Sequence, residues 1–310
     1  MAQRRIRSLV VAGATATGKT ALGEWLAERL GATIVCADSR QVFRELNIGT
    51  GKPTAAELAA LPHALFDALS LGQRPSAGWY AEAAAETVRA IDAAEGTALF
   101  VGGSGLYLRA VLNGLSAEPP RDAALRHRLM GEAAEHGPRA LHERLSGLDP
   151  ARAAQLAPAD TQRILRALEI VESSGHTSAW WCAQPAAPGL DAQWTVVEVT
   201  LTGDELSERI EQRTRMMFDS GLVEETRELV AAGHEAALSR LRAVGYDEAL
   251  ELLQGRLTRE QAEANTSLRT RQLAKRQRTW FRNQLKALRI SVAGRDIAGI
   301  GEEILVAFGD

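Results

Sequence analysis

The sequence predicts an α/β fold: a P-loop-containing parallel-sheet core with helices on both faces of the sheet, plus a mostly helical insertion domain. Short apolar runs alternate with helical patterns through residues 1–115, an order typical of βαβ units and a parallel sheet. The first apolar run leads into Gly-x-x-x-x-Gly-Lys-Thr at residues 13–20, and a helical pattern follows at once. In that context the motif indicates a phosphate-binding site.

The elements of this first part can be placed one by one. Continuous apolar runs of strand length, as in buried parallel strands, occupy residues 9–12, 32–37 and 97–101. Helical patterns occupy residues 21–30, 80–94 and 106–112. The first of these helices ends at Gly31, where a C-cap glycine is favoured.

The pattern changes after Leu115. Amphipathic, charged segments of helical periodicity occupy 122–135, 139–145 and 160–172, a late strand is predicted at 194–201, and 204–288 is helical in pattern. We therefore predict a core domain of residues 1–115 and 159–310, which carries a basic C-terminal helical segment. Residues 116–158 form the predicted helical insertion, with an alternative end near residue 190.

Composition excludes several classes of protein. The chain has 310 residues, of which 45% are hydrophobic and 24% charged, as in ordinary soluble proteins. The net charge of −3 excludes a global polyanion-binding signature, so any nucleic-acid site must be a local patch. Cys36 and Cys182 lack the spacing of metal ligands or of a disulfide framework, which favours a reducing, cytoplasmic location. No apolar stretch reaches the roughly 18 residues of a membrane span, so we expect no membrane partner.

Polar residues at the carboxyl ends of the predicted strands are the candidates for chemistry. The P-loop offers backbone amides to a diphosphate or triphosphate, Lys19 adds a charge, and the Thr20 hydroxyl can ligate Mg²⁺. Asp38 follows the second strand, whereas the third strand ends without the carboxylate usual in nucleotide-hydrolysing P-loop proteins. This layout favours a reaction in which diphosphate leaves and Asp38 acts as a base, although Asp38 could instead cap a helix. Ser104 could donate to a substrate, or serve as a turn residue.

The segment 269–289 is the most charge-biased part of the chain. It contains no acidic residue, and its eight cations are Arg269, Arg271, Lys275, Arg276, Arg278, Arg282, Lys286 and Arg289. Basic side chains can contact RNA phosphates, and the interleaved Trp280 could stack on an unpaired base. The alternative is a solvated helix face that Trp280 anchors to the core.

Taken together, these motifs resemble the tRNA dimethylallyltransferase family, also called tRNA isopentenyltransferases. The matching segments follow in family order at residues 13–20, 38–43, 47–53, 101–107, 162–169, 209–213, 244–246 and 270–277. The resemblance implies transfer of a dimethylallyl group from dimethylallyl diphosphate to the exocyclic N6 of the adenosine 3′-adjacent to the anticodon. It also implies Mg²⁺ as cofactor and the tRNA anticodon stem-loop as partner of a monomeric protein.

The resemblance implies roles for individual residues. The catalytic residues would be Asp38, Lys19, Arg213 and Ser104, with Thr20 as metal ligand. The diphosphate would be bound by Gly13, Ala14, Thr15, Ala16, Thr17, Gly18, Lys19 and Thr20. The tRNA would be contacted by Asp38, Ser39, Arg40, Gln41, Ser104, Arg126, Gln162, Arg163, Ile164, Leu165, Arg166, Arg242, Gly245, Tyr246, Lys275, Arg276, Gln277, Arg278, Trp280 and Arg282. No RNA contact is assigned to Asp247, which stands where the family usually has Arg.

Three other functions are compatible with a P-loop. A small-molecule kinase is disfavoured by the missing carboxylate after the third strand and by the basic segment. A prenyltransferase acting on free adenosine nucleotides would not need that segment. A non-catalytic RNA-binding protein would not need to keep Lys19, Thr20 and Asp38.

Overall fold

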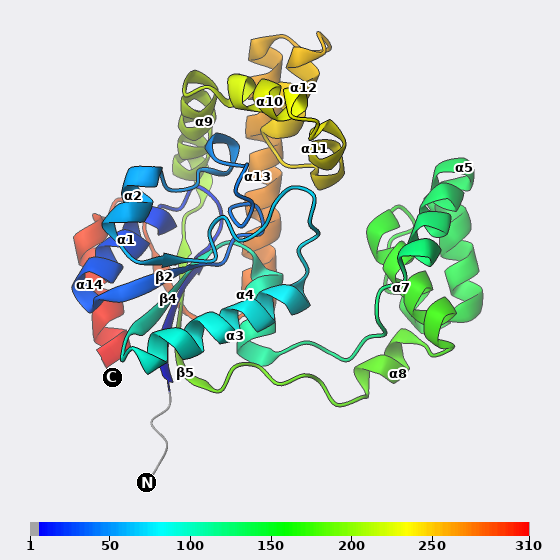
Figure 1. Ribbon diagram of the computed structural model, residues 1–310, viewed down its shortest axis with the longest axis horizontal. Helices are drawn as coiled ribbons and strands as arrows, with labels where there is room; N and C mark the ends of the chain where they lie inside the picture. The colour runs from blue at the N-terminus through cyan, green and yellow to red at the C-terminus, as the bar shows by residue number, and fades with distance from the viewer. Residues whose placement is uncertain (1–5, 310) are drawn as a thin grey trace. The chain divides into compact units, whose positions relative to one another are not determined.

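The computed structural model describes residues 6–309 and has a parallel sheet at its centre (Figure 1). Within the described residues, the order of the six strands is β3-β2-β4-β1-β5-β6, and every neighbouring pair is parallel. The strands are β1 (Ile6–Gly13), β2 (Ala32–Cys36), β3 (His63–Ala64), β4 (Thr97–Gly102), β5 (Ala192–Thr200) and β6 (Leu288–Ser291). All strands therefore end at the same edge of the sheet, where a ligand crevice is expected.

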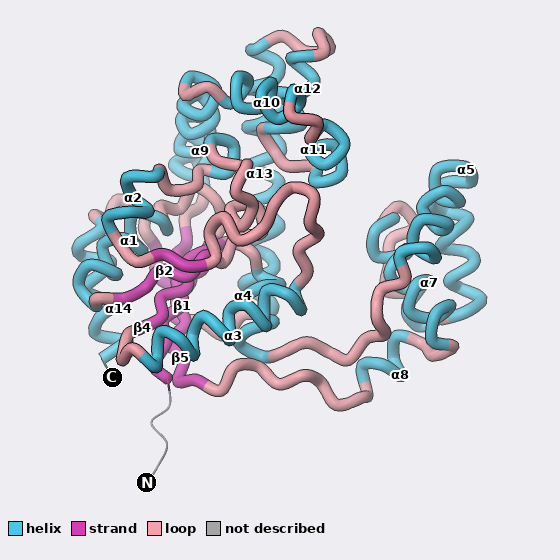
Figure 2. Tube along the Cα trace, in the orientation of Figure 1, coloured by secondary structure: helices cyan, strands magenta, loops and turns pink. Residues whose placement is uncertain are grey.

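Helices cover both faces of the sheet, which confirms the predicted fold class (Figure 2). Along β1, Val10 and Ala12 face a core shared with α3 (Ala77–Ala93) and α4 (Gly105–Asn113), while Leu9 and Val11 face a core shared with α1 (Lys19–Leu30) and α14 (Ile297–Gly309). Successive side chains of a strand point to opposite faces, so a continuous apolar run has to be covered on both sides.

Within the described residues, ten α-helices and one 3₁₀ turn belong with the sheet. They are α1 (Lys19–Leu30), the 3₁₀ turn η1 (Ile48–Thr50), α2 (Ala55–Ala60), α3 (Ala77–Ala93), α4 (Gly105–Asn113), α9 (Gly203–Asp219), α10 (Leu222–Ala231), α11 (Glu235–Leu241), α12 (Tyr246–Leu253), α13 (Arg259–Gln284) and α14 (Ile297–Gly309). The long basic helix α13 packs against α4, α9 and α12 (Figure 1). The helical pattern was predicted to continue through residue 288, but α13 ends at Gln284 and Leu288 begins strand β6, which the sequence pattern did not indicate.

The described chain divides into two compact units, one formed by the residues up to Asn113 and from Gly189, the other by Gly114–Pro188. The second unit contains α5 (Ala123–Leu148), α6 (Pro150–Ala153), α7 (Thr161–Ser174) and α8 (Ser178–Cys182). Gly137, at φ 78°, interrupts α5 before Pro138, between the two helices predicted there. The predicted domain limits at residues 1 and 310 lie outside the described residues.

The second unit runs past the predicted insertion end at residue 158 and stops close to the alternative end near residue 190. The physical reason is the shared core of α5 and α7. Leu129 and Leu145 of α5 pack in one cluster with Ile164 and Leu168 of α7. Since α7 buries its apolar face there, it belongs with the insertion helices rather than with the sheet.

Candidate active site

The P-loop joins β1 to α1 and leaves its backbone donors available for an anion. Gly13 is required by close packing, since a β-carbon there would lie 2.6 Å from the carbonyl oxygen of Val199 on β5. Gly18 adopts φ 84° at the N-cap of α1 and offers no side-chain cap, so the first N–H groups of the helix remain available. Ala16 also has a left-handed backbone, with φ 64°.

Lys19 lies in a partly buried, positively charged environment. Its Nζ donates to the carbonyl oxygen of Ala14 at 2.6 Å. Burial and, to a smaller extent, the charge of Arg213 lower the pKa of Lys19 to about 8, and the charge of Asp38 opposes the shift. Burial likewise lowers the pKa of Arg213, again opposed by Asp38. Two cations and one carboxylate predicted as catalytic therefore interact within one site.

Asp38 and Ser104 meet where β2 and β4 end. The Oδ1 of Asp38 accepts from the backbone N–H of Arg40 at 2.8 Å, so Asp38 stabilises a turn and caps no helix. The Ser104 hydroxyl accepts from the N–H of Ser39 at 2.8 Å. A β-carbon on Gly102 would lie 2.1 Å from the carbonyl oxygen of Ala37, which explains the glycine at the end of β4.

The loop of residues 47–51 is held in place next to these groups. Arg213 donates from Nη2 to the carbonyl oxygen of Thr50 at 3.0 Å, and Gln41 donates to the same oxygen at 3.2 Å. From the other side, the Glu225 carboxylate accepts from the N–H groups of Asn47 at 2.7 Å and Ile48 at 2.8 Å. Sequence reasoning missed Glu225, because no motif or local pattern marks it as a partner of a loop 178 residues away.

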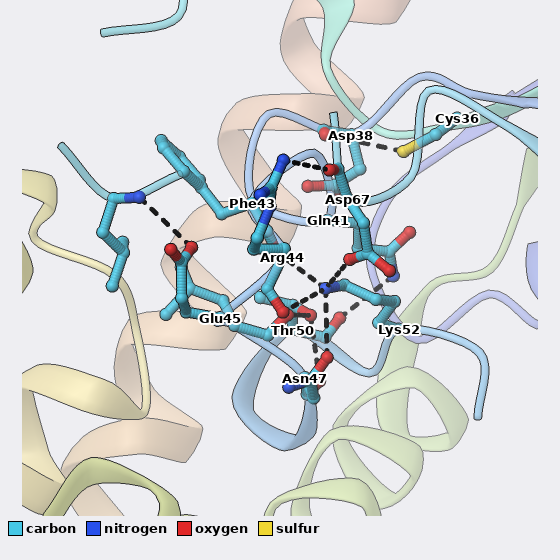
Figure 3. A network of polar contacts seen from close by, with 12 residues as sticks. Cys36, Asp38, Gln41, Phe43, Arg44, Glu45, Asn47, Thr50, Lys52 and Asp67 are labelled. Carbon is cyan, nitrogen blue, oxygen red and sulfur yellow. Dashed lines mark hydrogen bonds and ion pairs between the residues drawn. The ribbon is translucent and has the colours of Figure 1, made fainter. Parts of the chain in front are cut away.

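A buried lysine fixes the base of the same loop (Figure 3). The Lys52 side chain is 1% exposed and pairs with Asp67. Its Nζ also donates to the carbonyl oxygen of Phe43 at 2.6 Å and to Oδ1 of Asn47 at 3.0 Å. A buried ammonium requires such complete pairing, so we interpret Lys52 as a structural residue.

These elements surround one cavity of about 660 Å³ at the carboxyl edge of the sheet. Predicted site residues that line it are Thr15, Lys19, Thr20, Asp38, Ser39, Arg40, Gln41, Ser104, Arg213, Arg242, Tyr246, Arg276 and Gln277. Apolar side chains, among them Ile210, Met217 and Leu273, complete the wall. The cavity therefore offers both cationic and apolar side chains to a ligand.

Within the described residues, some cations of the basic segment 269–289 form ion pairs, and others do not. Arg269 pairs with Asp247 and Glu248, Arg271 pairs with Glu211, and Arg289, beyond helix α13, pairs with Glu198. The remaining five form no ion pair with any described residue and are Lys275, Arg276, Arg278, Arg282 and Lys286. Four of these five lie on α13 and Lys286 lies just beyond its end, and such unpaired cations are available to neutralise the phosphates of a nucleic acid.

Trp280 packs against the start of α4. A β-carbon on Gly105 would lie 2.2 Å from Cε3 of its indole, and the ring meets Phe281 edge-on with centroids 5.5 Å apart. The structure thus supports the reading in which Trp280 anchors α13. Tyr246 is buried, and its hydroxyl donates to Glu225 at 2.7 Å.

Asp247 connects two helices. Its Oδ2 lies 2.8 Å from Nη2 of Arg269, so it joins the start of α12 to α13. Burial raises the pKa of Asp247, and the hydrogen bond from Arg269 opposes the shift. Arg269 also donates to the backbone oxygen of Arg242, whose own φ is 48°. The Arg242–Gly245 turn is therefore fixed by its contacts with α13.

The remaining predicted RNA contacts lie in the second compact unit. Arg126 donates to Glu169 at 2.8 Å and to Gln162 at 3.0 Å, and Arg166 pairs with the same Glu169 at 3.2 Å. Arg163 is exposed and pairs with Asp160 at 3.3 Å. The side chains of Ile164 and Leu165 are buried in the core, which leaves their backbone for any RNA contact.

Mg²⁺ was expected with Thr20 as a ligand. The described residues contain no group of three or more His, Cys, Asp or Glu side chains arranged to hold a metal. Mg²⁺ bound with a phosphorylated substrate needs few protein ligands, because phosphate oxygens and waters fill most of its octahedron. The Thr20 hydroxyl at the cavity wall, beside the P-loop, fits that kind of site.

Comparisons with known proteins agree on one family. A family model described as IPP transferase matches residues 41–284. The tRNA dimethylallyltransferase of Myxococcus xanthus (strain DK1622) is 46% identical over 277 residues, which cover 89% of each chain. That of Koribacter versatilis (strain Ellin345) is 40% identical over 301 residues and 96% of each chain. The structure of a tRNA isopentenylpyrophosphate transferase from Bacillus halodurans is 31% identical, with a TM-score of 0.70 over 98% of this chain and 97% of that one.

Proposed function

This chain belongs to the tRNA dimethylallyltransferase family, and we propose that it moves a dimethylallyl group from dimethylallyl diphosphate to the exocyclic N6 of the adenosine 3′-adjacent to the anticodon. It is a transferase that modifies tRNA. The observation that supports the proposed site best is the convergence of the P-loop, Asp38 and basic helix α13 on one cavity. No described residue places a carboxylate at the end of β4, where a P-loop kinase or nucleotidase would have one.

The P-loop end of the cavity would bind the diphosphate of the donor. The N–H groups at the start of α1 point toward an anion there, and Lys19 and Arg213 add positive charge. Mg²⁺, when bound with Thr20, would neutralise further charge on the diphosphate. As the bond between the allylic carbon and the diphosphate oxygen breaks, this positive environment stabilises the departing anion.

The Asp38 end of the cavity would receive the adenine. Its N6 is a weak nucleophile, because the amine lone pair is delocalised into the ring. In the transfer, N6 forms a bond to the first carbon of the dimethylallyl group, diphosphate leaves with the bonding electron pair, and N6 loses a proton to the Asp38 carboxylate. Only Oδ1 of Asp38 is engaged by a hydrogen bond among the described residues, so Oδ2 can accept that proton.

The tRNA itself would lie along the unpaired cations of α13. Their charges suit a phosphate backbone, and the cavity beside them requires the target base to leave the anticodon-loop stack. The tRNA substrate favours a cytoplasmic location, and one chain supplies every group named above, which favours a monomer. Among the described residues, no helix combines the length and apolar character needed to cross a membrane.

The proposal is tested by incubating the protein with unmodified tRNA transcripts, Mg²⁺ and dimethylallyl diphosphate. We expect mass spectrometry of the digested nucleosides to show the added five-carbon group on adenosine, with one diphosphate released per transfer. A transcript with guanosine at the target position is the matched control and should gain no group. Hydrolysis of ATP with no product on either transcript would favour a P-loop kinase or nucleotidase instead.

A further inference from the structure

We infer that Gln277 is a positioning residue that holds the P-loop in shape for the diphosphate, and not a contact to tRNA. The inference rests on the proposed function, because it concerns the same diphosphate site. Gln277 lies on α13 between Arg276 and Arg278, inside the segment for which the family resemblance implies RNA contacts. Its own contacts point the other way, into the protein.

The Gln277 side-chain amide joins two loops that are far apart in the sequence. Its Oε1 accepts from the backbone N–H of Thr15 in the P-loop at 2.9 Å. Its Nε2 donates to the carbonyl oxygen of Gly103, directly after β4, also at 2.9 Å. A β-carbon on Gly103 would lie 2.5 Å from that Nε2, so the glycine permits the approach. One side chain therefore sets the distance between the loops that follow β1 and β4.

The P-loop needs such support because part of it is strained. Ala16, the residue after Thr15, has φ 64°, in the left-handed region that is unfavourable for a residue with a side chain. Strained backbone of this kind persists only where surrounding contacts fix it. The hydrogen bond from Thr15 to Gln277 fixes the backbone directly before the strained residue, and α1 fixes it afterwards, from Lys19 onward.

The two sequence neighbours of Gln277 on α13 have side chains that the described residues do not engage in ion pairs. Arg276 and Arg278 form no ion pair with any described residue, so both can meet RNA phosphates. The carbonyl and the amide nitrogen of Gln277 are each already engaged by the protein. We therefore expect these adjacent residues to have different roles. Gln277 supports the loop that binds the diphosphate, and Arg278 contacts the tRNA.

The test measures two affinities for the wild type and four variants at fixed pH and salt, in the presence of Mg²⁺. Inorganic pyrophosphate is the probe of the diphosphate site, by calorimetry, and an unmodified tRNA transcript is the probe of the RNA surface, by fluorescence anisotropy. Gln277→Ala should weaken pyrophosphate binding about tenfold, as expected for the loss of two ordinary hydrogen bonds that order the loop, while tRNA affinity stays within about twofold. Arg278→Ala, the matched control, should show the reverse pattern.

Gln277→Glu is a second variant in case Gln277→Ala fails to fold, because glutamate keeps the shape of the side chain. It removes the donor to Gly103 and adds a negative charge beside the P-loop, so pyrophosphate binding should fall further than in Gln277→Ala. Weakened tRNA binding with unchanged pyrophosphate binding would overturn the inference in favour of an RNA contact. Equal losses of both affinities, or no loss of either, would also overturn it. If the wild-type protein binds no pyrophosphate, or Lys19→Ala binds it normally, the proposed diphosphate site itself fails.

Discussion

Lys19 should make binding of the donor depend on pH near 8. Burial and the charge of Arg213 lower the pKa of this lysine to about 8 in the free protein. A lysine with a lowered pKa loses its proton, and hence its positive charge, as the pH rises through that value. The diphosphate binds best to the protonated form, so its affinity should be full below pH 8 and should fall above it.

The magnitude follows from the protonated fraction. With a pKa of about 8, roughly nine-tenths of Lys19 is charged at pH 7 and roughly one-tenth at pH 9, so the apparent affinity should fall about tenfold across that interval. Lys19→Arg is the matched control, since guanidinium stays charged throughout. Its residual pH dependence reports the titration of the ligand itself.

The assay is calorimetric binding of dimethylallyl diphosphate without tRNA, so that no turnover occurs, at half-unit steps from pH 7 to pH 9. The difference in log affinity between wild type and Lys19→Arg should change by about one unit over the range. Parallel pH profiles for the two proteins would refute the reasoning, because they would mean that Lys19 does not titrate there.

Two further predictions concern α13 and the loop of residues 47–51. Replacing Lys275 and Arg278 together by Ala should weaken the binding of cognate and non-cognate tRNA alike. It should also reduce the slope of log affinity against log salt by about 1.4, at about 0.7 per phosphate contact. Arg227→Ala, on α10, is the control, and an unchanged slope in the double variant would mean that α13 is purely structural. Glu225→Ala should lower the free energy of unfolding in urea by about 1–3 kcal/mol, because two loop N–H groups lose their acceptor. Glu228→Ala on the exposed side of the same helix should change it by less than about 0.5 kcal/mol, and equal effects of both variants would contradict the role of Glu225.

The placement of the central site was predictable because it follows from sheet geometry. Parallel strands end at one edge, so residues after β1, β2 and β4 must lie near one another. Lys19, Asp38 and Ser104 accordingly line the same cavity. Their roles in catalysis and RNA binding stay predictions.

The contacts of the basic helix could not be predicted from its sequence. Basic residues occur on more than one face of this helix, so the sequence does not indicate which of them face the protein. The acidic partners of these residues come from elements that are distant in the sequence. Arg271 meets Glu211 of α9, and Arg269 meets Asp247 of α12. Gln277 turns inward to the P-loop for the same reason, which is tertiary packing rather than local pattern.

The short strand β6 and the extent of the second unit show a related limit. β6 has four residues, of which Ile290 alone is buried, so it carries too little apolar alternation to be recognised. The end of the second unit depends on which element packs against the apolar face of α7. An amphipathic pattern indicates that a helix has a buried face, but it does not identify the element that covers that face.

The central claim is that Asp38 accepts the proton from adenine N6 while the P-loop holds the leaving diphosphate. Its most direct test is the single-turnover rate of prenyl transfer by Asp38→Asn, with tRNA and dimethylallyl diphosphate both prebound at saturating concentration. The variant keeps the size and the hydrogen-bonding oxygen of the side chain, so both affinities should stay within a few-fold of wild type. The rate of transfer should fall about 10²–10⁴-fold, as is typical when a general base is removed. A single-turnover rate close to that of the wild type would contradict the account.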